Sequence, residues 1–107
     1  MKENINGTIY LIKQISTGKC YVGQTTLDPY ERMKQHLSSP NSDDFHILLK
    51  NNQTDFTFQI LRTNIRKQNV LNQFECYYIG YYHCIEEGFN KSMGGSLTNL
   101  SNYYLPN

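Results

Sequence analysis

The stretch TIYLIKQISTGKCYVG, residues Thr8 to Gly23, decides how the chain folds. It consists of two runs of β-branched and aromatic residues on either side of Ser16-Thr17-Gly18, which is the pattern of a β-hairpin. Each run carries one tyrosine, Tyr10 or Tyr21. A loop of two or four residues puts both tyrosines on one face of the hairpin, whereas a three-residue loop needs a bulge at Gly18 to do so. We expect the shared face.

The size and composition of the chain indicate one soluble domain. Its 107 residues, 38% of them hydrophobic and 18% charged, suffice for one modest core, so we expect a single domain over residues 1–107. No apolar run approaches the roughly 20 residues of a membrane span, and the N-terminus lacks the apolar core of a signal peptide. The three cysteines form no CxxC pair, which favours reduced thiols. These features predict an intracellular protein that is neither secreted nor in a membrane.

The net charge of the chain is +1. Proteins that bind nucleic acids usually have a clear excess of basic residues. A function on nucleic acid must therefore depend on the local placement of Lys and Arg, or on a DNA-binding region that is missing here.

A helix is predicted directly after the hairpin. The sequence Asp28-Pro29-Tyr30-Glu31 combines an N-cap acid, proline at the first helical position and an acid at the third, and the helix should end near Ser38. Within this helix, Arg32 and His36 are four residues apart, so they share a face. Both side chains can therefore point toward one target.

Three further elements are predicted, a helix from Ser42 to Asn52, a strand over residues 56–62 and a long helix from residue 67 to about residue 86. The strand alternates apolar and polar residues, so Phe56, Phe58 and Ile60 should face the core and the strand should pair with the hairpin. The predicted fold class is α/β (α+β), with a three-stranded antiparallel sheet flanked by helices.

The polar residues of these elements occur in an order that resembles the GIY-YIG nuclease superfamily. They are Tyr10, Tyr21, Arg32, His36, Glu75 and Asn90. Thr8-Ile9-Tyr10 corresponds to the first motif and Tyr21-Val22-Gly23 to the second, and the resemblance covers about residues 7–95. Thr8 replaces the glycine that gives the first motif its name, which is harmless in a strand. The pattern is most similar to phage-type homing and free-standing endonucleases, which usually add a separate DNA-binding region.

The resemblance implies a metal-dependent DNA endonuclease. Tyr10 would be the general base, and Arg32 would bind the scissile phosphate through its planar, permanently charged fork. Glu75 would be the sole protein ligand of Mg²⁺, for which Mn²⁺ can substitute. Tyr21 and His36 would position the water or form a hydrogen bond with Tyr10.

Four other residues are candidates for the same site. The resemblance implies that Asn90 holds a backbone phosphate or the metal-binding carboxylate. Lys19 lies two residues before Tyr21 in the strand, so we expect it to be the cation beside Tyr10 that favours the phenolate. Lys34 and Lys91 are candidate DNA contacts.

Two other functions are considered beside this interpretation. The chain could be a structure-selective repair or recombination nuclease of the same superfamily, or a DNA-binding or protein-interaction module without catalysis. A single site cuts one strand at a time, so a duplex break needs a second nick or a homodimer. His46 is interpreted as a structural or surface residue.

Overall fold

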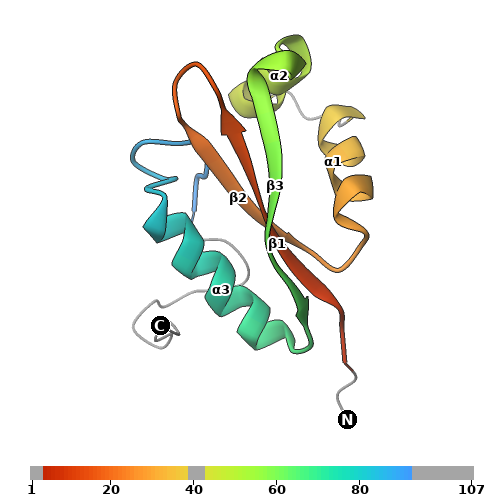
Figure 1. The fold of residues 1–107 in the computed structure, drawn as a ribbon. Helices are drawn as coiled ribbons and strands as arrows, with labels where there is room; N and C mark the ends of the chain where they lie inside the picture. Colours follow the sequence, from red (N-terminus) through yellow and green to blue (C-terminus); the bar gives the residue numbers. More distant parts are fainter. Residues whose placement is uncertain (1–3, 39–42, 93–107) are drawn as a thin grey trace.

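A three-stranded antiparallel sheet forms the centre of the molecule (Figure 1). The computed structural model describes residues 4–38 and 43–92. The strands are β1 (Gly7–Gln14), β2 (Cys20–Thr25) and β3 (Phe56–Ile65), in the order β2-β1-β3. The predicted sheet and its pairing with the hairpin are therefore confirmed.

The hairpin loop places the two tyrosines on one face. The amide of Gln14 donates to the carbonyl of Lys19 at 2.9 Å, which leaves a four-residue loop. Gly18 in this loop has a φ of 79°, a conformation that glycine adopts without strain. In the resulting register Tyr10 and Tyr21 share a face, with their ring centroids 6.4 Å apart. The expected shared face is confirmed.

The helices cover both faces of the sheet (Figure 1). On one face lie α1 (Pro29–Ser38) and α2 (Asp44–Asn51), and on the other lies α3 (Gln68–Tyr81). The carboxylate of Asp28 accepts a hydrogen bond from the amide of Tyr30 at 2.9 Å, so α1 starts and ends where its sequence predicts. Among the described residues, no helix is long and apolar enough to cross a membrane.

Strand β1 separates two buried clusters, because its side chains alternate between the faces of the sheet. The cluster under α1 and α2 consists of Tyr10, Ile12, Phe45 and Leu49. The cluster under α3 consists of Ile9, Leu11, Cys20, Val22, Ile65, Leu71, Ile79 and Cys84. Each large apolar side chain buried here stabilises the fold by about 1.5–3 kcal/mol. The three cysteines are free and buried.

Two predictions about the elements are wrong in detail. Helix α3 ends at Tyr81, not near residue 86, because the chain then turns back so that the amide of Phe89 reaches the carbonyl of Cys20 at 2.9 Å. Ile60 was expected to face the core but is 37% exposed. Strand β3 is an edge strand, and on its helix-covered face only Phe56 and Phe58, near its start, pack against the buried cluster.

A short 3₁₀ helix (Gln53–Asp55) connects α2 to β3. The N-cap of α2 is Asp43, whose carboxylate accepts from the amide of His46 at 2.9 Å. The sequence predicts the start of this helix at Ser42, which lies outside the described residues. Residues 93–95, the end of the stretch that resembles the nuclease superfamily, also lie outside them.

Candidate active site

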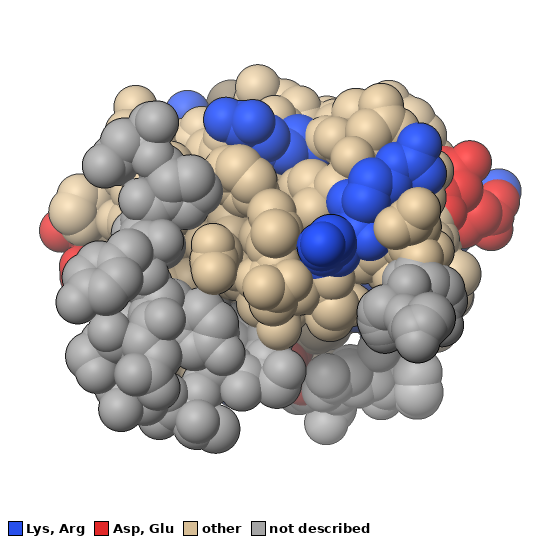
Figure 2. Space-filling view, turned by 90° about the horizontal axis from the view of Figure 1, so that it is seen from below, with Lys and Arg blue, Asp and Glu red and all other residues tan. Residues whose placement is uncertain are grey.

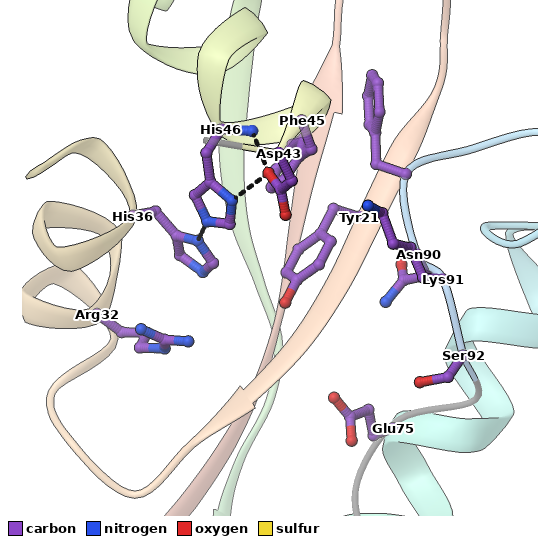
Figure 3. A pocket seen from close by; sticks show the side chains of 11 residues that line it. Tyr21, Arg32, His36, Asp43, Phe45, His46, Glu75, Asn90, Lys91 and Ser92 are labelled. Atoms are coloured by element: carbon purple, nitrogen blue, oxygen red, sulfur yellow. Dashed lines mark hydrogen bonds and ion pairs between the residues drawn. The ribbon is translucent and has the colours of Figure 1, made fainter. Parts of the chain in front are cut away.

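A pocket of about 420 Å³ opens where β2 passes between α1 and α2 on one side and α3 on the other (Figure 3). It gathers most of the site residues that the sequence predicts. These are Tyr21, Arg32, His36, Glu75, Asn90 and Lys91. Residues far apart in the sequence thus meet in one cavity.

Three of these side chains come from three different elements. Arg32 projects from α1, Tyr21 from β2 and Glu75 from α3, and the Tyr21 hydroxyl points into the space between the other two (Figure 3). The pocket therefore offers a cation that suits an anionic phosphate, a carboxylate that suits a metal ion, and a phenol between them.

Glu75 is held by a network of side-chain amides. It is 6% exposed, and its Oε1 accepts a hydrogen bond from Nε2 of Gln24 at 2.7 Å. The same Gln24 nitrogen donates to Asn72 at 2.9 Å, and Gln68 donates to the Gln24 oxygen at 2.8 Å. Burying a carboxylate is costly, so a buried acid that lines a pocket is a candidate functional residue.

The donors around Glu75 fit a hard cation with few protein ligands. Within residues 4–38 and 43–92, no group of three or more His, Cys, Asp and Glu could hold a metal ion. A lone carboxylate suits Mg²⁺, which keeps several waters and takes further ligands from substrate phosphates. It does not suit Zn²⁺, which requires several nitrogen or sulfur ligands.

Tyr10 lies behind the pocket wall. Its side chain is fully buried, and its hydroxyl is 2.7 Å from Nε2 of His36. The ring lies over Gly23, where an added Cβ would collide with the Tyr10 hydroxyl, so the glycine of the second motif makes room for the tyrosine of the first. Burial raises the pKa of Tyr10 far above that of free tyrosine, although Arg32 acts in the opposite direction. This position does not favour direct contact between Tyr10 and a water in the pocket.

Tyr21 is the tyrosine that faces the pocket. It is half-buried, and its ring stacks on Phe45 with a centroid distance of 4.7 Å. Burial raises the pKa of Tyr21, the Glu75 carboxylate raises it further, and Arg32 lowers it. Glu75 and Arg32 therefore shift the pKa of this phenol in opposite directions.

His36 is the buried partner of Tyr10. Its other ring nitrogen, Nδ1, is 3.0 Å from Nε2 of His46, and Nδ1 of His46 is 2.7 Å from Oδ1 of Asp43 (Figure 3). Burial lowers the pKa of His36 to about 4, and the nearby Arg32 and His46 lower it as well. His36 is therefore a neutral imidazole at neutral pH.

Asp43 and His46 also line the pocket, where the order of polar residues did not predict them. The signal that could have found them is the spacing Asp43-x-x-His46, in which an N-cap carboxylate can contact a side chain one turn into the helix.

Protonation of His36 should destabilise the folded state in acid. The pKa is about 4 in the folded protein against 6.5 for the free group, so between these values the unfolded chain binds the proton more readily. The free energy of unfolding contributed by His36 is therefore complete above pH 6.5 and decreases as the pH falls to 4, by up to about 3 kcal/mol. Urea unfolding across this pH range measures the effect.

The control for this prediction is the exposed His83, which pairs with Glu86 at the surface. The variant His36→Gln should show a shallower pH dependence of unfolding than the wild type and than His83→Gln. Equal slopes for the wild type and His36→Gln would contradict the prediction.

Asn90 binds the main chain of β2. Its Oδ1 accepts from the amide of Val22 at 2.8 Å, and its Nδ2 donates to the carbonyl of Val22 at 2.9 Å. Asn90 thereby fixes the loop that carries Lys91, an exposed residue at the pocket. Contact of Asn90 with a phosphate or with the Glu75 carboxylate stays a prediction, for which the second N–H of Nδ2 is suited.

Lys19 and Lys34 are not among the pocket-lining residues. Lys19 is exposed at the loop end of the hairpin, four residues along the strand from Gly23, and this amounts to about 13 Å at the usual rise per residue. The cation that acts on Tyr10 is Arg32, so the expected pairing with Lys19 is wrong. Lys34 forms an exposed ion pair with Glu31 at 3.3 Å.

Comparisons with known proteins identify the family and the fold. The family described as GIY-YIG catalytic domain matches residues 6–88. A mutant of the catalytic domain of intron endonuclease I-TevI has a similar structure, with a TM-score of 0.73 over 85% of this chain and 98% of that chain. Its sequence identity of 20% means that this similarity shows the fold alone. No curated protein sequence matches the chain.

Proposed function

The chain belongs to the GIY-YIG family of endonucleases, and we propose that it is a Mg²⁺-dependent DNA endonuclease that hydrolyses one phosphodiester bond at a time. The observation that carries the proposal is the convergence of Arg32, Tyr21 and Glu75 from three elements on one pocket. Hydrolysis of a phosphodiester needs an oriented water, positive charge at the phosphate oxygens and help for the departing oxygen.

Arg32 is the residue suited to the scissile phosphate. Its guanidinium is half-buried at the pocket, donates a hydrogen bond to Gln35 at 3.1 Å and also acts on the Tyr10 hydroxyl as a hydrogen-bond donor. A guanidinium has five N–H donors in a plane, so most of them remain for two phosphate oxygens at once.

Glu75 is the residue that would hold Mg²⁺. When bound, the ion supplies positive charge to the phosphate oxygens and to an attacking water. The hydrogen bond from Gln24 to Oε1 orients the carboxylate without supplying a positive charge that would compete with a metal.

We assign contact with the water to Tyr21, in place of Tyr10, because Tyr21 lines the pocket and Tyr10 is fully buried. Glu75 raises the pKa of Tyr21, so a cation at this carboxylate reverses that effect and favours the phenolate. Arg32 acts in the same direction as such a cation. Tyr21 can then accept a proton from the water that attacks the phosphorus.

The surface provides basic areas in spite of the low net charge. On the face seen from below, Lys and Arg side chains stand out near the middle of the described surface, and Asp and Glu lie toward its rims (Figure 2). Lys91, which is exposed at the pocket, and Lys34, which is exposed on α1 and paired with Glu31, are the candidate contacts with DNA phosphates.

Nicking of supercoiled plasmid tests the proposal. We expect the wild type to convert supercoiled DNA to open circles in Mg²⁺ or Mn²⁺ and to be inactive in EDTA, with linear DNA appearing later because one site cuts one strand. Tyr21→Phe should bind DNA and nick it far more slowly. Binding without nicking by the wild type under every metal condition would overturn the proposal and favour a catalytically silent DNA-binding module.

A further inference from the structure

Four side chains form a hydrogen-bonded chain behind the pocket, in the order Tyr10, His36, His46, Asp43, with heavy-atom distances of 2.7, 3.0 and 2.7 Å. Resting on the proposed nuclease function, we infer that Asp43 and His46 are positioning residues, which hold His36 in the tautomer that accepts a hydrogen bond from Tyr10. Neither residue needs to touch the substrate for this role.

The donor and acceptor in each of these hydrogen bonds follow from the carboxylate of Asp43. Asp43 is partly buried, which raises the pKa of its carboxyl, but the hydrogen bonds from the amide and ring of His46 outweigh burial and hold this pKa below its usual value. An ionised carboxylate can only accept hydrogen bonds. When the His46 ring carries one proton, that proton therefore lies on Nδ1, which leaves a lone pair on Nε2.

The lone pair on Nε2 of His46 fixes the tautomer of His36. His36 must donate to it from Nδ1, so Nε2 of His36 carries a lone pair and accepts from the Tyr10 hydroxyl at 2.7 Å. The opposite tautomer of His36 would place two lone pairs face to face at 3.0 Å. His36 is 2% exposed, so water does not relieve that conflict.

The tautomer of His36 decides whether its Nε2 accepts or donates the hydrogen bond with Tyr10. With Nε2 unprotonated, His36 accepts a hydrogen bond from the Tyr10 hydroxyl and so holds that hydroxyl in one orientation. With the proton already on Nε2, His36 would donate to Tyr10 instead, and the hydroxyl would have to turn away. The ring of His36 also contacts Tyr21, with a centroid distance of 5.4 Å, so its orientation affects the phenol at the pocket.

Asp43 has a structural role that a substitution can preserve. Its Oδ1 caps α2 by accepting the amide of His46 at 2.9 Å. Asparagine is as good an N-cap as aspartate, so Asp43→Asn should keep the helix. Its neutral amide oxygen can keep the cap but accepts the Nδ1 proton of His46 less strongly than a carboxylate does, which weakens the control over the tautomer. Asp44→Asn is the matched control, because Asp44 is exposed and lies in the same first turn.

Long-range ¹H–¹⁵N NMR of the imidazole rings tests the inference without DNA or metal. At about pH 8, where unperturbed histidine is neutral, we expect His36 protonated on Nδ1 alone in the wild type and in Asp44→Asn. A signal for protonated Nε2 should appear in Asp43→Asn and in His46→Gln, which serves as the second variant if the first does not fold. Protonation of His36 on Nε2 in the wild type, or an unchanged His36 in both variants, would overturn the inference.

The rate of cleavage separates this inference from the proposed function. In single-turnover nicking, Asp43→Asn should be slower by about tenfold or more at unchanged DNA affinity, because orientation of a proton acceptor affects the chemical step. An altered tautomer with an unchanged rate would overturn the catalytic part. An inactive wild type with the expected tautomers would instead contradict the nuclease proposal and leave the positioning by Asp43 supported.

Discussion

Glu75→Gln should reduce metal-dependent nicking by about a thousandfold and leave the protein at least as stable as the wild type. A metal ion supplies several kcal/mol of transition-state stabilisation, and each 1.4 kcal/mol or so corresponds to a tenfold rate. Glutamine keeps an oxygen that can accept the hydrogen bond from Gln24. It removes a charge at a position that is 6% exposed, so the cost of burying that charge disappears. Plasmid nicking and thermal unfolding measure the two effects.

The control is Glu87→Gln, which removes an exposed carboxylate just after α3. It should change neither the nicking rate nor its dependence on the Mg²⁺ concentration. Nicking by Glu75→Gln at the wild-type rate in Mg²⁺ would show that this carboxylate does not hold the metal. A marked loss of thermal stability would show that Glu75 serves the fold.

The features of the fold that the sequence predicts are those that local chemistry decides. The hairpin follows from a glycine with positive φ between β-branched runs, and the start of α1 follows from an N-cap acid before proline. Both depend on contacts within a few residues. The end of α3 and the exposure of Ile60 depend on where the rest of the chain packs, and no local pattern reports that.

The sequence likewise predicts some features of the site and misses others. The resemblance carried by the order of the polar residues predicts Tyr21, Arg32 and Glu75 at one site, and all three line the pocket. Lys19 was placed by its strand face alone, which ignores the distance along the strand. The buried ring of Tyr10 packs against Gly23, which lies opposite it on β2. This contact depends on the register of β1 and β2, which no local pattern reports.

The pairing of His46 with His36 arises from the packing of α2 on α1. The two residues are ten apart in the sequence, with a stretch between the helices, so no helical or strand period joins them. A histidine with an acid one turn earlier is usually an ordinary surface pair on a helix. Only the position of α2 turns this pair toward the pocket.

Arg32→Ala should slow nicking by about 100- to 1000-fold, with a smaller effect on DNA binding, because a contact that strengthens as charge develops on the phosphate acts mainly on the rate. Arg32→Lys should recover only part of the rate, because an ammonium group keeps the charge but loses the planar fork. Single-turnover nicking and DNA-binding titrations at the same salt concentration separate the two effects.

The same substitution has a second consequence that can be measured without DNA. Arg32 lowers the pKa of His36, because a nearby cation opposes its protonation, so Arg32→Ala should raise the pKa of His36 from about 4 toward its usual value. The matched control is Lys13→Ala, since Lys13 is exposed on β1 and does not line the pocket. If Lys13→Ala reduced the rate as much as Arg32→Ala, the effect would be one of overall charge. An unchanged pKa of His36 in Arg32→Ala would show that the guanidinium does not act on the hydrogen-bonded side chains of Tyr10, His36, His46 and Asp43.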